Sequence, residues 1–144
     1  MNPQPGTYVL LLQNHVKASV QVGRWREVAF EAGYYLYVGS AFGPGGVRAR
    51  VLRHCRSDKP LHWHIDYLRA GASPLGAWYT HDPIPREHAW ADILRGLDGL
   101  SPIRGFGCSD CKCEAHLFHT VTAPDLARFT QAAGGEIEAW TYRN

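Results

Sequence analysis

The sequence predicts a protein of the α+β class, in which a small and mainly antiparallel sheet is combined with helices. The chain has 144 residues, of which 45% are apolar and 19% are charged, enough for a packed core. Segments rich in aromatic and β-branched residues follow one another closely in the first third, which favours antiparallel pairing. Later segments carry helix start and stop signals. We therefore expect a single domain over residues 1–144 that begins with a loose arm at residues 1–5.

Seven segments are expected to be strands. The first is almost wholly apolar, as in a strand buried on both faces, and its period of two places Tyr8, Leu10 and Leu12 on one face. Because the first four segments lie so close along the chain, an antiparallel meander is the simplest topology. The expected strands are residues 6–13, 18–22, 28–30, 34–38, 74–81, 115–121 and 136–142.

Four segments are expected to be helices. The first must end before Pro60, since the residue before a proline disfavours helix. The third begins with Pro85 and an acid in its first turn, and Gly96 follows its last arginine. The fourth opens with a capping-box-like pattern at residues 122–125 and closes at the glycines 134–135. The first three helices are expected at residues 45–56, 61–69 and 85–96, and a loop at 97–113.

Positive charge is concentrated in residues 48–59 of a chain whose formal net charge is only +2. Arginine binds phosphate through two parallel hydrogen bonds, and the glycine-rich run 43–46 would leave backbone amides free for phosphate at the start of a helix. A solvated basic face is the alternative. The glycines match no nucleotide-cofactor fingerprint. The expected DNA-binding residues are Arg48, Arg53, Arg56, Lys59, Gly39 and Ser40.

The apolar runs, the N-terminal segment and the cysteine spacing limit the class of protein that this chain can be. No apolar run approaches the ~20 residues of a membrane helix, and the N-terminus has no signal-like segment, so we expect a cytoplasmic protein with no membrane partner. Three of the four cysteines fall within six residues, a poor framework for disulfides. With His116 they could hold zinc, but the spacing is cramped and no second C-x-x-C pair exists, which argues against structural zinc. The cysteines are Cys55, Cys108, Cys111 and Cys113.

Glu87 lies on an otherwise apolar helix stripe with Trp90, Ala91 and Leu94. A carboxylate on the packed side of a helix needs an arginine, a hydrogen-bond network or a metal ion as its partner. Its hard oxygen atoms suit one Mg²⁺ or Mn²⁺ ion. Alternatively, Glu87 turns back toward the helix N-terminus and solvent.

Two further groups of polar side chains are candidates for chemistry. Tyr8 and Tyr37 lie on strands expected to be neighbours, where a phenol could hold a water, orient a phosphate or act as a base, or could simply pack. His62 and Asp66 are spaced i, i+4, so a His–Asp pair is possible, and a capping role for Asp66 is the alternative.

The tripeptides Gly6-Thr7-Tyr8 and Tyr37-Val38-Gly39 resemble the two that name the GIY-YIG endonuclease superfamily. Three longer segments resemble its Uri-type branch, which also occurs fused to endonuclease III-like proteins. These segments are residues 45–50, 62–68 and, taken together, 105–107 with 116–118. The resemblance implies a small antiparallel sheet flanked by helices. It also implies metal-dependent hydrolysis of DNA phosphodiester bonds, in DNA repair or processing, with low intrinsic sequence specificity.

The resemblance also implies roles for particular residues. Arg50 would stabilise the phosphate, with Arg48 as the rival assignment, and His54, which shares a helix face with Arg50 and Arg53, would support the site. Tyr8 or Tyr37 would help to activate or position the attacking water, and Glu87 would hold the divalent cation.

Members of the superfamily usually have a late asparagine that lines the site. In this chain the only asparagine after Glu87 is Asn144. Either Asp110 or His116 takes the place of that late asparagine, or the role is absent. The alternatives to an endonuclease are a catalytically weak or inactive DNA-binding module of the same fold and a zinc-stabilised interaction domain.

Overall fold

A six-stranded antiparallel sheet forms the centre of the molecule. The computed structural model describes residues 1–108 and 112–143. The strands lie in the order β6-β7-β4-β1-β5-β8, and each is antiparallel to its neighbours. The expected α+β class with a mainly antiparallel sheet is confirmed. The strands of this sheet are β1 (Gly6–Asn14), β4 (Gly33–Ala41), β5 (Ser73–Thr80), β6 (Ser101–Pro102), β7 (Leu117–Thr120) and β8 (Glu138–Thr141).

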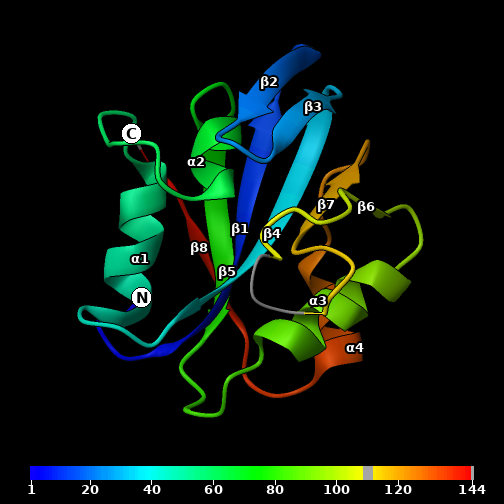
Figure 1. The fold of residues 1–144 in the computed structure, drawn as a ribbon. Coiled ribbons are helices and arrows are strands. Elements are labelled where there is room, and N and C mark those ends of the chain that lie inside the picture. Colours follow the sequence, from blue (N-terminus) through cyan, green and yellow to red (C-terminus); the bar gives the residue numbers. More distant parts are fainter. Residues whose placement is uncertain (109–111, 144) are drawn as a thin grey trace.

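The expected meander is wrong, because β1 pairs directly with β4 along nine residues. The two strands between them, β2 (Ala18–Val22) and β3 (Arg26–Phe30), form a separate two-stranded hairpin. Both β1 and β4 are long and rich in apolar residues, so their direct pairing buries far more surface than pairing with the short hairpin strands would. The hairpin buries Val22 and Phe30 in the same core as α2, and it lies at the upper end of the sheet in Figure 1.

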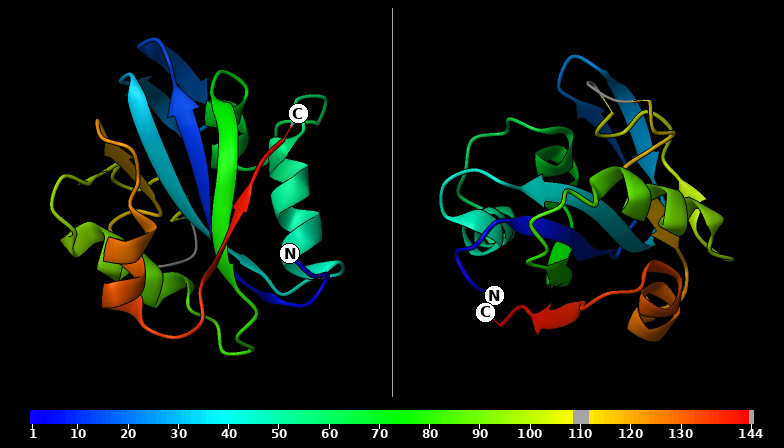
Figure 2. Two further views of the ribbon diagram at one scale, coloured as in Figure 1. Left: turned by 180° about the vertical axis from the view of Figure 1, so that it is seen from behind. Right: turned by 90° about the horizontal axis from the view of Figure 1, so that it is seen from below.

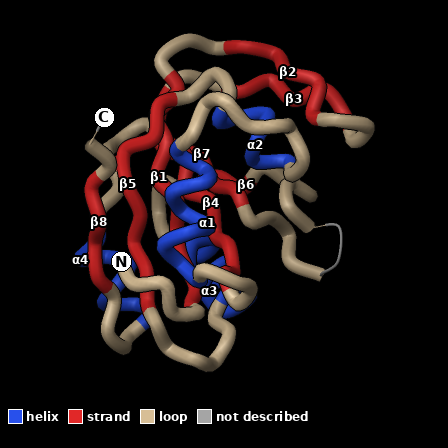
Figure 3. The backbone as a smooth tube through the Cα atoms, turned by 90° about the vertical axis from the view of Figure 1, so that its left-hand side faces the viewer, coloured by secondary structure: helices blue, strands red, loops and turns tan. Residues whose placement is uncertain are grey.

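Two pairs of helices cover the two faces of the sheet (Figures 1 and 3). On one face lie α1 (Gly46–Cys55) and α2 (His64–Arg69), and on the other α3 (Glu87–Gly96) and α4 (Leu126–Ala133). The alternation of β1 serves both cores: Tyr8, Leu10 and Leu12 belong to the core beneath α1 and α2, whereas Val9 belongs to the core beneath α3 and α4. The predicted common face of the first three is confirmed.

Several element boundaries differ from the expectation. The second helix begins at His64 instead of residue 61, because the Asp66 carboxylate accepts hydrogen bonds from the backbone N–H groups before it. The segment expected as a loop contains the short edge strand β6. The last helix begins later than the expected opening at residue 122, because its N-cap is Asp125, whose side chain accepts from the Ala127 N–H. It ends at Gly134 as expected.

Residues 1–5, expected as a loose arm, run along the first turn of α1 (Figure 2). The Val47 N–H donates to the Gln4 carbonyl at 3.0 Å and the Arg48 N–H donates to the Asn2 carbonyl at 3.3 Å. A side chain at Gly46 would collide with the Gln4 carbonyl, so this glycine permits the close approach. The helix amides that the sequence suggested for phosphate are therefore occupied by the chain itself.

Candidate active site

The two tyrosines lie on the same face of the two central strands. In the β1–β4 ladder Tyr8 is opposite Gly39 and Leu10 is opposite Tyr37, so the tyrosines are diagonal neighbours, as their sequence positions predict. A Cβ atom at position 39 would lie 2.3 Å from the Tyr8 hydroxyl. Gly39 is therefore part of the site because it leaves room for the Tyr8 phenol, and it is itself buried rather than available to DNA.

His54 of α1 holds the Tyr8 hydroxyl, with 2.8 Å between the oxygen and Nε2. The histidine is almost fully buried, and burial lowers its pKa to about 3, so it is neutral at pH 7. Its Nδ1 is buried without a partner among the described residues. An unpaired buried acceptor is tolerated better than an unpaired N–H, so we infer that Nε2 carries the hydrogen and donates to the Tyr8 oxygen.

Arg50 lies one turn before His54 in α1 and approaches the same two tyrosines. Its guanidinium lies close enough to lower the pKa of both Tyr8 and Tyr37. It also donates to the Ser40 carbonyl at 3.2 Å and lies 4.6 Å from the centre of the Trp63 ring. Contact with an aromatic face holds a guanidinium in position without neutralising its charge. Arg50 is therefore a positioned cation beside two phenols.

Trp63 also holds Arg53, whose guanidinium lies 4.3 Å from its ring centre. Arg53 makes two hydrogen bonds to the Asp66 carboxylate, at 3.1 and 3.3 Å. Burial raises the pKa of Asp66, but the hydrogen bonds from Arg53 and from two backbone N–H groups outweigh it, and the net pKa is lowered. Arg53 thus has a structural partner. Trp63 was not among the residues predicted for the site, although its position between His62 and His64 was an available signal.

Glu87 is the first residue of α3, on the opposite side of the sheet from α1. Burial is the main reason that the pKa of each tyrosine is raised, and the nearby Glu87 carboxylate raises both further. Glu87 therefore lies within electrostatic reach of both phenols. Its side chain is 23% exposed, while Trp90, Ala91 and Leu94 of the same stripe are buried, as the periodicity predicts.

His116 is the basic group nearest to Glu87 among the described residues, with 3.8 Å between Nδ1 and Oε2. Burial lowers the pKa of His116, although the Glu87 carboxylate opposes this shift. The His116 carbonyl accepts from the Val38 N–H, which fixes this residue beside β4. Of the two residues expected in place of the family asparagine, His116 lies beside Glu87, and Asp110 lies outside the described residues, as does Asn144.

A second cluster adjoins Glu87. His88, the next residue of α3, has its Nδ1 3.0 Å from the Cys113 sulfur, and its ring centroid lies 5.8 Å from that of His116. One ligand atom from each of His88, Cys113 and His116 lies within 4.8 Å of the others. The cysteine spacing predicted a different set, which included Cys108 and Cys111, and Cys111 lies outside the described residues.

The remaining basic residues expected to bind DNA have different surroundings. Arg48 is exposed on α1 and does not belong to the groups that shift the tyrosine pKa values. Arg56 lies 3.4 Å from Asp58 in an exposed pair. The Lys59 ammonium donates to the carbonyls of His54 and Arg56, so it closes the end of α1. Of the two candidate arginines, Arg50 lies beside the tyrosines.

The possible His62–Asp66 side-chain pair is wrong, because Asp66 accepts from the backbone N–H of His62 and from Arg53. Capping, the alternative, is what the carboxylate does. His64 has a role that the sequence did not suggest: its Nδ1 accepts from the Gly107 N–H at 3.0 Å, and its ring stacks on Trp25. The hydrogen bond attaches the segment before β7 to α2, and the stacking attaches the turn between β2 and β3 to it.

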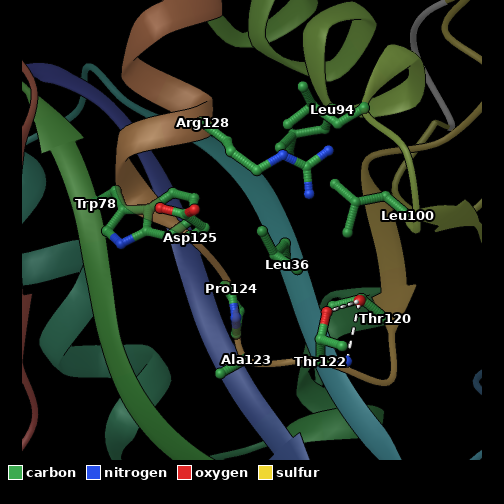
Figure 4. A pocket seen from close by; sticks show the side chains of 11 residues that line it. Leu36, Trp78, Leu94, Leu100, Thr120, Thr122, Ala123, Pro124, Asp125 and Arg128 are labelled. Carbon is green, nitrogen blue, oxygen red and sulfur yellow. Dashed lines mark hydrogen bonds between the residues drawn. The ribbon is translucent and has the colours of Figure 1, made fainter.

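A separate pocket lies between the sheet and the helices α3 and α4 (Figure 4). Its volume of about 20 Å³ holds roughly one water molecule. Leu36, Trp78 and Leu94 line it and belong to the second core, and neither Tyr8 nor Tyr37 does. The pocket is therefore a packing gap away from the candidate active site.

The comparisons with known proteins give a family without an assigned activity. The family described as "Domain of unknown function DUF123" matches residues 7–139, which include every described helix and all of the sheet except Gly6, Trp140 and Thr141. The chain belongs to the DUF123 family. No curated protein and no solved structure matches it. Among the described residues of this DUF123 domain, no helix has the length and apolar character needed to cross a bilayer.

Proposed function

We propose that this DUF123 protein is a divalent-metal-dependent endonuclease of the GIY-YIG superfamily, Uri-type branch, that hydrolyses DNA phosphodiester bonds in repair or processing. One observation carries the proposal. Tyr8 and Tyr37 lie close enough to a cation from α1, Arg50, and to a carboxylate from α3, Glu87, for both charges to shift the tyrosine pKa values. These four residues come from four elements and occur in the order that the resemblance implies.

The residues present fit a hard divalent cation. Glu87 offers partly exposed carboxylate oxygens, and its nearest described basic neighbour, His116, has a lowered pKa and so leaves the negative charge largely uncompensated at pH 7. Mg²⁺ or Mn²⁺ held by Glu87 would act as a Lewis acid toward a phosphoryl oxygen. This preference for oxygen ligands distinguishes the Glu87 carboxylate from the adjacent cysteine and histidines.

The chain's own groups would bind and orient the phosphodiester. Arg50 would donate to non-bridging phosphate oxygens. Its guanidinium would stabilise the negative charge that develops on them in the transition state more than the charge of the bound substrate. Because their pKa values are raised, Tyr8 and Tyr37 are neutral phenols at pH 7, so they would position water and phosphate by hydrogen bonding rather than act as bases. His54, with its pKa of about 3, would orient the Tyr8 hydroxyl.

The test is nicking of supercoiled plasmid and cleavage of branched DNA with Mg²⁺ or Mn²⁺. We expect Glu87→Gln and Arg50→Ala to lower the cleavage rate by about 10²–10³-fold, since each removes charge stabilisation of the transition state. Arg95→Ala is the control, because it removes an exposed arginine from the last turn of α3, at the other end of that helix from Glu87. Cleavage by the Glu87 and Arg50 variants at the wild-type rate would reject the assignment.

A second candidate is a DNA-binding module of the same fold without catalysis. The raised pKa values of both tyrosines favour it, since neither phenol is available as a base at pH 7. Such a protein would bind DNA with an affinity that falls steeply with salt, and it would cut no DNA with any metal. Cleavage that depends on Glu87 would exclude this candidate.

A further inference from the structure

The cluster of His88, Cys113 and His116 combines two imidazoles and a thiol from segments far apart in the sequence. His88 lies in the first turn of α3, and the other two lie in the segment that leads into β7. His88 is exposed and Cys113 is partly exposed, so the cluster is open to solvent. An ion could therefore reach it without unfolding the chain.

The spacing of the ligand atoms is that of a tetrahedral zinc site close to its bound geometry. With Zn–N of about 2.1 Å and Zn–S of about 2.3 Å, two ligand atoms on one ion lie roughly 3.4–3.6 Å apart. Here the His88 nitrogen and the Cys113 sulfur are 3.0 Å apart, and all three ligand atoms lie within 4.8 Å. Movements of ~1.5 Å by the exposed His88 and the half-buried Cys113 side chains toward the buried His116 would bring the three ligand atoms to these spacings.

The chemistry of the three groups selects the ion. Thiolate and imidazole favour Zn²⁺ and similar transition metals, whereas Mg²⁺ prefers oxygen ligands. We propose that His88, Cys113 and His116 bind one Zn²⁺ ion, separate from the divalent cation proposed at Glu87. The ion fastens the segment before β7 to the start of α3. The fourth position is left to water or another donor.

The site also acts as a positioning device. His88 is the immediate neighbour of Glu87, and the His116 Nδ1 lies 3.8 Å from the Glu87 carboxylate. An ion that joins His88 to His116 fixes the first turn of α3 against β4, because the His116 carbonyl is bonded to the Val38 N–H. Zinc binding itself stands apart from nuclease activity, and only this positioning role rests on the proposed function.

The experiment measures metal directly on the whole chain. The protein is purified without chelator, incubated with ZnCl₂, freed of excess metal and analysed by mass spectrometry. We expect one equivalent of zinc in the wild type and its loss in Cys113→Ser and His88→Gln. The matched controls Cys108→Ser and His15→Gln should keep it, since Cys108 is outside the cluster and His15 is an exposed histidine in another loop. His88 is exposed, so its variant should fold even if the cysteine variant does not.

Two further readouts make the outcome decisive. Cobalt substitution should give a thiolate-to-cobalt absorption band that Cys113→Ser lacks, and chelation should lower the melting temperature of the wild type but not of His88→Gln. Wild-type protein that binds no more zinc than the two cluster variants overturns the proposal. None of these measurements involves DNA, so a protein that binds zinc but cuts no DNA would refute only the nuclease.

Discussion

His54 gives the sharpest test of the site's geometry, because its burial makes the fold sensitive to acid. Its pKa is about 6.5 in the unfolded chain and about 3 in the folded protein. Between these values the unfolded state binds one more proton than the folded state. Stability from this group is therefore complete above pH 6.5 and is lost as the pH falls toward 3.

The size of the effect follows from the two pKa values. Lowering the pH from 7 to 4.5 reduces the free energy of unfolding by about 2.5 kcal/mol through His54 alone. Asp66 and Asp82 also have lowered pKa values, so they lose stability in acid as well, below their unfolded values. Those losses are common to wild type and any His54 variant, and they cancel in a comparison of the two.

The assay is urea unfolding of the wild type and of His54→Gln at pH 7 and pH 4.5. Glutamine can still donate to the Tyr8 oxygen but does not titrate, so the variant should lose about 2.5 kcal/mol less than the wild type between the two pH values. The comparison uses the change with pH, so a variant that is less stable at pH 7 is still informative. Equal acid-induced losses in the two proteins would show that His54 is not buried as a neutral group, and the Tyr8–His54 pairing would then be wrong.

Three further predictions concern the groups around this pair. Gly39→Ala should reduce stability by about 1–3 kcal/mol in chemical denaturation, since the new methyl group displaces the Tyr8 phenol. Gly43→Ala, whose methyl group would meet no atom of the described residues within 4 Å, should change stability little, and equal effects of the two substitutions would contradict the packing. Asp66→Asn should lower stability at pH 7 by about 3 kcal/mol, as expected on breaking a buried ion pair, and the difference should shrink as the pH falls below the unfolded pKa of Asp66; a difference independent of pH would count against the pair. Trp63→Ala should slow DNA cleavage at least about tenfold because the Arg50 guanidinium loses the ring that supports it, while Trp63→Phe retains most activity. Identical rates for the two variants would show that the aromatic contact has no part in cleavage.

The strands that carry the tyrosines could be predicted from the sequence because each is long and distinctive. The first is almost wholly apolar and buried on both faces, and Tyr37 lies in an aromatic run. Period two then placed Tyr8 on the correct face. Likewise, the helical stripe of Trp90, Ala91 and Leu94 correctly placed Glu87 beside a packed surface.

Other features depend on contacts that no local pattern encodes. The hairpin between β1 and β4 leaves the sheet because the two long strands pair better with each other than with it. The amides of Val47 and Arg48 are taken by carbonyls of the N-terminal arm, which has no sequence signal of its own. His88 and Cys113 meet across 25 positions, so cysteine spacing alone pointed to a different ligand set.

The central position of β1 has a consequence for synthesis of the chain. Thr7 pairs with Thr80, 73 residues further along, so β1 is synthesised well before β5 and waits for it before both of its edges are paired. Until then Val9, Leu10 and Leu12, which have no exposed surface in the folded protein, remain in a strand with an open edge. An exposed apolar strand of this kind pairs readily with other copies. Yield in recombinant expression should therefore depend on slow translation, low temperature or chaperones more than on the final stability of the fold.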